Sequence, residues 1–418
     1  MARHGFSARL RVSARLVALL WAWPAAGQAV SFTPIEPPPS DFAPAFALSA
    51  DGSTVVGHDV IADPANPFGG FLPPVVWRDA GPAEVLSDDF GLRSASGIVV
   101  SGDGSRIALS GCFDPPCTFP ISGPSSNGDY VYENGGFTPL TPLLPSDRGL
   151  GQITGISDDG RVIVRASSLV PSTRFVDGVA SELGLTPTAL SGDGRVSVGT
   201  AARTAAYAIE TQSPMTLTLP SDAVMGLPTD VSFDGGVIVG SYTTDRATRA
   251  GFRWENGVAT SLGDGVAPSR VSGDGSVMIG GGSIWFGLDQ RVLGDFLAGL
   301  GLDLSGWSGL IGLDVSNDGR TILGLGLDPA GQFQNWVAVI PEPGTGALLA
   351  FGLAGLGARA RSTTRGRSNP LARLRRHRAP SRGFAPLAGA GSHLWLDGLP
   401  TLPETERGAA AHSFRCRP

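Results

Sequence analysis

Residues 231–240 read Val231-Ser232-Phe233-Asp234-Gly235-Gly236-Val237-Ile238-Val239-Gly240, with an Asp-Gly pair between two apolar segments. An Asp-Gly pair in this setting is the strongest short-range indication of a β-hairpin. We expect a type I′ turn, in which both central residues take a positive φ. The hydroxyl of Ser232 can bond to the turn backbone and hold it, so the conspicuous Asp234 is interpreted as architectural.

The Ser-x-Asp-Gly pattern occurs seven times along the chain, and successive copies lie 34 to 56 residues apart with a mean of about 44. This period is typical of a four-stranded propeller blade. The aspartates of the seven copies are Asp51, Asp103, Asp159, Asp193, Asp234, Asp274 and Asp318. The sequence therefore predicts an all-β fold, a β-propeller of seven four-stranded blades over residues 30–340.

The second half of each repeat predicts another hairpin, most clearly over residues 251–263, where Asn256-Gly257 requires a tight turn. The last repeat lacks a fourth strand, because it stops at the apolar segment 336–340. Residues 30–35 precede the first repeat and alternate like an unpaired strand. We expect this N-terminal strand to complete the last blade, since closing the ring removes exposed strand edges.

Over residues 45–340 the Ser-x-Asp-Gly, Val-Val-Gly and Phe-x-Trp elements resemble the HAF-type extracellular repeat, most fully in the copy at 229–263. The resemblance implies a class of exported repeat protein, and that class has no agreed activity.

Residues 1–29 are typical of a secretory signal peptide. A basic segment ends at Arg15, the apolar segment 16–23 follows, and small residues lead to Ala29. The apolar segment is too short to span a bilayer, which takes about 20 helical residues. We expect cleavage after Ala29.

A second targeting signal is expected over residues 341–367. Pro341-Glu342-Pro343 is followed by the uncharged segment 344–358 and then by a cluster of Arg residues. This order resembles the PEP-CTERM sorting signal of Gram-negative bacteria. The resemblance implies export, transient anchoring by a short transmembrane helix, processing by an exosortase, and delivery to the cell surface or the extracellular matrix. Residues 368–418 follow it, are rich in Arg and Pro, and are predicted to be disordered.

The charge distribution argues against a nucleic-acid partner. All 31 basic residues are Arg, and residues 30–358 hold 15 of them against 34 acidic residues, a formal charge of −19. Nucleic-acid binding needs a cationic face. We expect the repeat domain to be an acidic monomer.

No familiar catalytic motif is present. Asp230 and Asp314 begin segments that imitate a Ca²⁺ loop, but Ser241 and Leu325 stand where a bidentate Glu is needed. We therefore expect turn chemistry, and neither a metal nor a cofactor. The acidic candidates for a glycosidase pair are assigned to solvated hairpin positions; they are Glu133, Glu182, Glu210 and Glu255.

Three further features are interpreted from the exported context. Cys112 and Cys117 are expected to form a short disulfide loop. His58 is expected at the surface or the rim of the ring. The insertions 58–75 and 110–128 could form a binding rim on one face.

The predicted function is a surface or matrix module that binds extracellular polysaccharide or has a structural role. The alternative is a secreted carbohydrate-active hydrolase that uses carboxylates at the mouth of the propeller. A purely structural surface-layer component is a third possibility. Two inward-facing carboxylates would favour the enzyme, and a polar or aromatic rim without them would favour binding.

Overall fold

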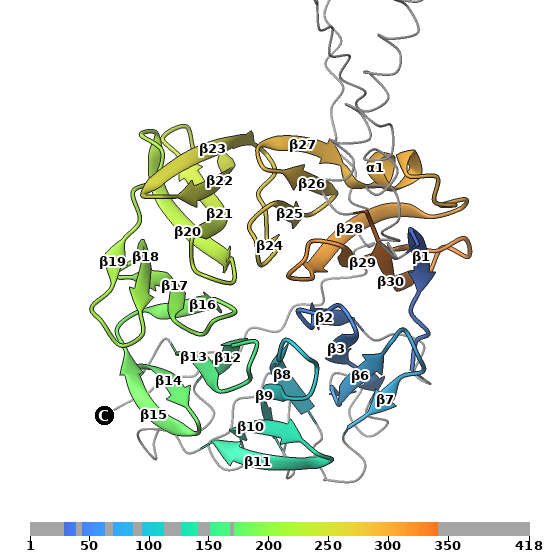
Figure 1. Ribbon diagram of the computed structural model, residues 1–418, viewed down its shortest axis with the longest axis horizontal. Helices are drawn as coiled ribbons and strands as arrows, with labels where there is room; N and C mark the ends of the chain where they lie inside the picture. The colour runs from blue at the N-terminus through green and yellow to red at the C-terminus, as the bar shows by residue number, and fades with distance from the viewer. Residues whose placement is uncertain are drawn as a thin grey trace, which may run out of the picture. The chain divides into compact units, whose positions relative to one another are not determined.

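The computed structural model describes residues 29–38, 44–62, 70–86, 94–112, 127–140, 151–167 and 171–341. All of them belong to the unit formed by residues 1–358. Seven antiparallel sheets of four strands stand in a ring (Figure 1), so the prediction of a seven-bladed propeller is confirmed. Within the described residues α1 (Leu293–Gly299) is the one helix.

Each of blades 1 to 6 starts with its innermost strand at the ring centre and continues outward in chain order. Blade 1 contains β2 (Ala45–Leu48), β3 (Thr54–His58), β6 (Pro74–Arg78) and β7 (Glu84–Val85). Blade 2 contains β8 (Ser94–Val100), β9 (Ile107–Cys112), β10 (Asn127–Glu133) and β11 (Gly136–Leu140). Blade 3 contains β12 (Gly151–Ile156), β13 (Val162–Ser167), β14 (Ser172–Val176) and β15 (Val179–Leu183).

The next three blades repeat this order. Blade 4 contains β16 (Thr186–Leu190), β17 (Val196–Ala201), β18 (Thr204–Ile209) and β19 (Met215–Thr216). Blade 5 contains β20 (Ala223–Val231), β21 (Val237–Thr244), β22 (Arg249–Glu255) and β23 (Val258–Asp264). Blade 6 contains β24 (Arg270–Val271), β25 (Val277–Gly280), β26 (Ser283–Phe286) and β27 (Asp289–Val292).

Blade 7 joins the two ends of the repeat region. It contains β28 (Ser308–Val315), β29 (Thr321–Leu327), β30 (Phe333–Val339) and, outermost, β1 (Ser31–Pro34). The N-terminal strand pairs antiparallel with β30, with Ser31 opposite Val339 and Pro34 opposite Trp336. The expected closure of the last blade by the N-terminal strand is therefore confirmed, and the ring is closed by main-chain hydrogen bonds.

The turn between the first two strands of each blade differs from the expected type I′ geometry. The Gly N–H donates to the Ser carbonyl at 2.8–3.1 Å, as in Gly235 to Ser232. Only the Gly has a positive φ, +69° to +77° across the seven copies, and none of the seven Asp residues does. The turn is thus a type I turn followed by a left-handed Gly, the usual form of a longer hairpin loop.

The second hairpin of the blade has the geometry that its sequence predicts. Asn256 and Gly257 both have positive φ, at 52° and 83°, and the pairs Asn134-Gly135 and Asp177-Gly178 match them. Two consecutive left-handed residues define the type I′ turn, which explains why Asn or Asp stands before each Gly.

The hydrophobic core lies between neighbouring blades. Trp285 and Met278 of blade 6 pack with Val237 and Val239 of blade 5 in one cluster. Fully buried aromatic side chains recur around the ring; they are Trp77, Phe175, Phe252, Trp285 and Trp336. Full burial of a large apolar side chain contributes about 1.5–3 kcal/mol. The apolar residues that flank each Ser-x-Asp-Gly turn therefore hold the blades together.

A buried ion pair that the sequence did not indicate joins blades 2 and 3. Nε of Arg165 lies 2.7 Å from a carboxylate oxygen of Asp129, and the two side chains are 1% and 7% exposed. Ser110 donates to the same carboxylate at 2.6 Å and accepts the N–H of Ile153 at 3.0 Å. Burial is the largest influence on Asp129 and raises its pKa, which the charge of Arg165 counteracts.

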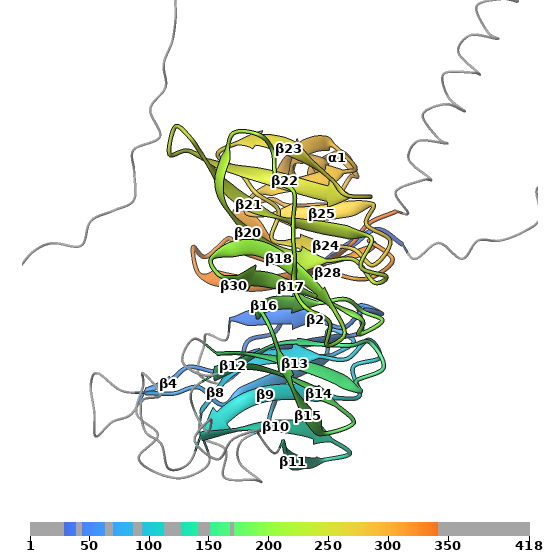
Figure 2. The ribbon, with the colours of Figure 1, turned by 90° about the vertical axis from the view of Figure 1, so that its left-hand side faces the viewer.

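The links between the second and third strands of a blade leave the ring on the face opposite the Ser-x-Asp-Gly turns. In blade 1 this link carries a small hairpin, β4 (Ile61–Ala62) with β5 (Gly70–Phe71), which projects from one face of the ring (Figure 2). The insertion in blade 2 connects the equivalent strands, β9 and β10. Both predicted insertions therefore start from the same face.

Several predicted features lie outside the described residues. These include residues 1–28 of the signal peptide, Glu342 and Pro343, the apolar segment 344–358, the tail 368–418, Cys117 and the side chain of Cys112. Among the described residues no helix has the length and apolar character needed to cross a membrane.

Candidate functional site

A β-bulge shapes the innermost strand of most blades. In five blades the pairing of the first two strands skips one residue, located five positions before the turn Asp. The skipped residues are Phe46, Thr154, Thr188, Thr229 and Leu313. A bulge redirects the side chain that follows it. The following residues, among them Asp230 and Asp314, line the central channel.

The channel contains an open cavity of about 150 Å³ whose two sides differ in chemistry. Blades 5, 6 and 7 contribute Asp230, Arg270 and Asp314 at equivalent positions. Blades 1 to 4 contribute small apolar residues at the same level, namely Ala47, Val99, Gly155 and Ala189. We call the first side the charged wall and the second the apolar wall. A cavity with few, convergent polar groups is the usual form of a ligand site.

Arg270 and Asp314 form an ion pair within the charged wall. Nε of Arg270 lies 3.5 Å from Oδ1 of Asp314, and the side chains are 36% and 14% exposed. Asp314 also accepts the N–H of Leu48 in blade 1 at 2.8 Å, and Nη1 of Arg270 donates to the Ser269 carbonyl at 2.9 Å. These contacts hold both charged groups in fixed positions beside the cavity.

Asp230 is the second carboxyl group of the charged wall. Its Oδ2 accepts the N–H of Val271 in blade 6 at 2.8 Å. Burial raises the pKa of Asp230 to about 6, the nearby charge of Arg270 opposes this rise, and the charge of Asp314 adds to it. Burial also raises the pKa of Asp314. Carboxyl groups with raised pKa values in a cavity are candidates for a functional role.

Three side chains obstruct the end of the channel nearest the Ser-x-Asp-Gly turns. The amide of Asn317 in blade 7 donates to the carboxylate of Asp158 in blade 3, across the ring. Phe233 of blade 5 lies beside them, since it also lines the cavity. The equivalent position in three other blades is Gly, where a Cβ would come within 2.5–2.7 Å of these side chains. These three glycines are Gly102, Gly192 and Gly273.

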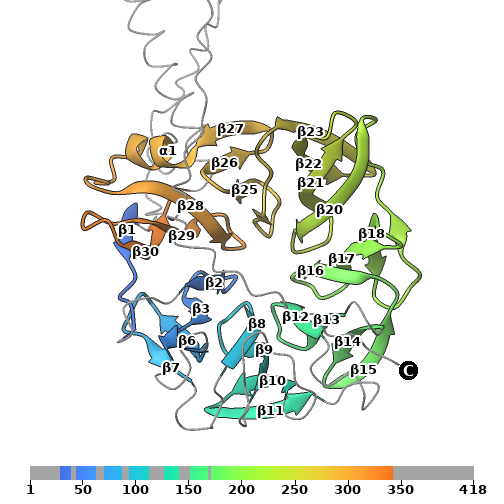
Figure 3. The same ribbon diagram turned by 180° about the vertical axis from the view of Figure 1, so that it is seen from behind.

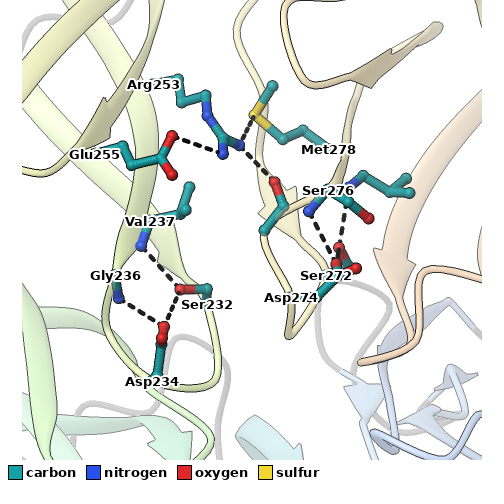
Figure 4. Close-up of polar contacts among 12 residues, drawn as sticks. Ser232, Asp234, Gly236, Val237, Arg253, Glu255, Ser272, Asp274, Ser276 and Met278 are labelled. Atoms are coloured by element: carbon teal, nitrogen blue, oxygen red, sulfur yellow. Dashed lines mark hydrogen bonds and ion pairs between the residues drawn. The ribbon is translucent and has the colours of Figure 1, made fainter. Parts of the chain in front are cut away.

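The seven repeat aspartates all lie in turns and bond to their own turn. Each carboxylate accepts the hydroxyl of the preceding Ser at 2.5–3.1 Å and the N–H two residues later at 2.8–3.0 Å. Figure 4 shows this network for Asp234 and Asp274 in neighbouring blades. This is the architectural role that the sequence suggested for these residues.

Each of the two calcium-like segments has one Asp in the turn and one Asp at the central channel. Asp234 bonds within its turn, whereas Asp230 lines the channel and bonds to Val271. The same division separates Asp318 from Asp314. No group of three or more His, Cys, Asp or Glu side chains suited to a metal ion occurs in the described part of the chain.

Arginines connect the turns of adjacent blades. Nη1 of Arg253 in blade 5 donates to the carbonyl of Gly275 in blade 6 at 2.5 Å, and its Nη2 bonds to Glu255 at 3.1 Å (Figure 4). Arg78, Arg106 and Arg174 make the equivalent contact to the next blade. Of the glycosidase candidates, three face arginines at 3.1–3.5 Å on the blade exterior; they are Glu133, Glu210 and Glu255. Glu182 is exposed on β15.

The expectation of His58 as a surface or rim residue is wrong. His58 ends β3, is 8% exposed, and its ring lies 4.8 Å from that of Phe46. Burial lowers its pKa to about 4, so the imidazole is neutral at pH 7. Strand β3 continues one residue beyond its apolar segment and so includes His58, whose ring packs against that of Phe46.

The sequence does not predict the charged wall. It places Asp230 and Asp314 at the start of calcium-like segments and assigns no role to Arg270. One signal was available: the residue four positions before the turn Asp is small and apolar in blades 1 to 4 and charged in blades 5 to 7. A change from apolar to charged residues at one position of a repeat indicates that the blades differ in function at that position.

Comparison with known proteins identifies the C-terminal signal. Residues 339–362 match the family described as the PEP-CTERM protein-sorting motif. A comparison with curated proteins finds no significant match.

A comparison with solved structures finds similar chains at low sequence identity. Among them is TolB from Acinetobacter baumannii, which is 13% identical with a TM-score of 0.40 over 70% of this chain and 65% of that one. Oligogalacturonate lyase from Vibrio parahaemolyticus is 8% identical with a TM-score of 0.48, over 75% and 95% of the two chains. The propeller domain of the Trilobed protease from Pyrococcus furiosus is 10% identical with a TM-score of 0.46, over 71% and 95%. The present chain thus spans less than two thirds of the Acinetobacter protein, and these similarities concern the fold alone. The chain carries a PEP-CTERM sorting signal, typical of proteins exported through the envelope of a Gram-negative bacterium, behind a seven-bladed β-propeller.

Proposed function

We propose that this exported propeller is a binding module of the cell surface or extracellular matrix, and that its ligand is extracellular polysaccharide. The observation that carries the proposal is the cavity in the central channel, with its charged wall facing an apolar wall. Polar groups that converge on a partly apolar cavity suit a ligand with hydroxyl groups on a carbon ring. The sorting signal at 339–362 supports a destination where such polymers are found.

The route to that destination is part of the proposal. An exosortase-type enzyme would process the segment that follows Pro341, after transient anchoring in the membrane. The HAF-type resemblance of residues 45–340 is consistent with an extracellular repeat domain. We expect the propeller to act as a monomer, because a closed propeller leaves only the short outer edge of each blade unpaired.

Retention of the polysaccharide tests the proposal. The exported protein is immobilised, incubated with the extracellular polysaccharide of the producing organism, and washed, and the retained sugar and new reducing ends are measured. We expect retention without new reducing ends, and loss of retention in Arg270→Gln. The matched control is Arg291→Gln, because Arg291 is 53% exposed on β27 and pairs with Asp289 away from the channel. Absence of retention by the unmodified protein would contradict the proposal.

A hydrolase is the second candidate, favoured by one specific observation. Asp230 and Asp314 are two carboxyl groups that line the same cavity, and burial raises the pKa of both. Glycoside hydrolysis needs an acid with a raised pKa and a second carboxylate within about 5–10 Å across the bond. New reducing ends that disappear in both Asp230→Asn and Asp314→Asn would establish the hydrolase and overturn the binding module.

A further inference from the structure

We infer that the central cavity receives part of one six-membered sugar ring that carries no carboxylate, presented as the end of a chain or of a branch. The inference rests on the proposed function and specifies which part of the polysaccharide is recognised. It is drawn from the volume of the cavity, the distribution of charge around it and the obstruction at one end.

The volume limits the ligand to a single ring. The cavity measures about 150 Å³. A cavity of about 150 Å³ in another protein holds one benzene molecule. A hexopyranose has about twice as many non-hydrogen atoms as benzene, so the cavity has room for part of one sugar ring and none for a second. A disaccharide would have to extend beyond the level of Asp230 and Arg270.

The charged wall favours a neutral ligand over an anionic one. Arg270 lies between Asp230 and Asp314 in the order of the blades, so positive and negative groups alternate. The wall holds two carboxylates and one guanidinium, so a uronate would bring its carboxylate near two acidic groups. Hydroxyl groups can donate to the carboxylates and accept from the guanidinium, and therefore match both kinds of group.

The apolar wall also suits a sugar ring. The side chains at Ala47, Val99 and Ala189 are small, and Gly155 has none, so they leave room beside the charged wall. Their apolar surface can pack against the C–H groups of a sugar ring, while the hydroxyl groups face the charged wall. Neither wall alone would select a sugar over another neutral or charged molecule.

The side chains that block the channel near the Ser-x-Asp-Gly turns indicate that the bound sugar ring is a terminal one. The bond between Asn317 and Asp158 crosses the channel, and Phe233 lies beside it. A polymer cannot thread through the propeller past these side chains. A sugar that enters from the opposite face must therefore be the last unit of its chain or branch.

Competition between the polymer and single sugars tests the inference. The full exported protein retains the organism's polysaccharide, and a panel of methyl pyranosides is added as competitors: glucose, galactose, mannose, rhamnose, glucuronate and glucosamine. We expect at least one neutral methyl pyranoside to release the polymer at millimolar concentration, and the glucuronate derivative to be at least tenfold weaker.

A steric variant adds a second readout. Ala47→Leu fills the apolar wall and should reduce retention at least tenfold, while Ala259→Leu on the outer strand β23 should not; thermal unfolding checks that both variants fold. Retention that no neutral pyranoside displaces, or that Ala47→Leu leaves unchanged in a folded protein, would overturn the terminal-ring inference but leave the binding module standing. Failure of the unmodified protein to retain polymer would refute both.

Discussion

Asp158 and Asn317 are 159 residues apart in sequence, yet the amide of Asn317 donates a hydrogen bond to the carboxylate of Asp158. The two residues occupy the same position of the repeat, between the Ser and the Asp of the turn, in blades 3 and 7. These blades face each other across the ring (Figure 3). The bond therefore links opposite sides of the propeller directly, in addition to the contacts between neighbouring blades.

Loss of this bond should destabilise the ring. Burial raises the pKa of Asp158, and the hydrogen bond from Asn317 opposes that effect. A hydrogen bond to a charged group contributes about 1.5–3 kcal/mol. We expect Asn317→Ala to lower the free energy of unfolding by about that amount, measured by urea denaturation. In a double-mutant cycle, Asp158→Ala should add little to Asn317→Ala; additive losses would show that the two residues stabilise the ring independently.

The left-handed glycines of the first turn should be less replaceable than those of the second. Gly275 and Gly257 both have positive φ, at +73° and +83°. A Cβ at Gly275 would lie 2.6 Å from Cγ2 of Val237 in the preceding blade, whereas a Cβ at Gly257 meets nothing within 4 Å. A left-handed Ala costs about 1–2 kcal/mol, and overpacking adds about 1–3 kcal/mol.

We therefore expect Gly275→Ala to destabilise the protein by about twice as much as Gly257→Ala, measured by chemical denaturation. Equal losses for the two variants would mean that backbone strain alone explains the glycine of the repeat and that the contact with the neighbouring blade is unimportant.

The blade number and ring closure could be predicted from sequence because they depend on local signals. Asp-Gly and Asn-Gly pairs fix turns within a few residues, and their period fixes the repeat. The charged wall could not be predicted in this way, because the bulge at Thr229 turns Asp230 toward the channel against simple strand alternation. The partners of Asp129 and Asp158 lie in other blades, so their bonds follow from assembly of the ring rather than from any local pattern.

The stability of the protein should depend on pH through Asp230. Its pKa is raised by burial to about 6 in the folded protein, against about 3.9 in an unfolded chain. The folded state therefore holds this proton more tightly. The resulting stabilisation is complete below about pH 4 and is lost as the pH rises through 6.

Asp230→Asn mimics the protonated group and removes this dependence. We expect the free energy of unfolding of the variant, relative to the unmodified protein, to rise by roughly 2–3 kcal/mol between pH 4 and 6.5. Asp303→Asn is the control with opposite sign, since hydrogen bonds from Ser305 lower the pKa of that exposed carboxyl. A flat difference for Asp230→Asn over this range would contradict the raised pKa.

Two ion pairs, one buried and one exposed, should contribute differently to the free energy of unfolding. Asp129 and Arg165 are almost fully buried, at 7% and 1% exposure, whereas Asp289 and Arg291 are 62% and 53% exposed. Removing one partner of a buried pair costs about 3–5 kcal/mol because the other charge loses a partner in a buried site, while an exposed pair contributes about 0–1 kcal/mol. We expect Asp129→Ala to lower the free energy of unfolding by at least three times as much as Asp289→Ala.

A double variant distinguishes the loss of the ion pair itself from the cost of keeping Arg165 buried without Asp129. Replacing both members of a buried pair with apolar residues of similar volume is often neutral or stabilising. Asp129→Leu combined with Arg165→Met should therefore recover most of the stability lost in Asp129→Ala, measured by thermal and urea unfolding. If the double variant is as unstable as the single one, the pair contributes through hydrogen bonds such as that from Ser110, and not through charge compensation.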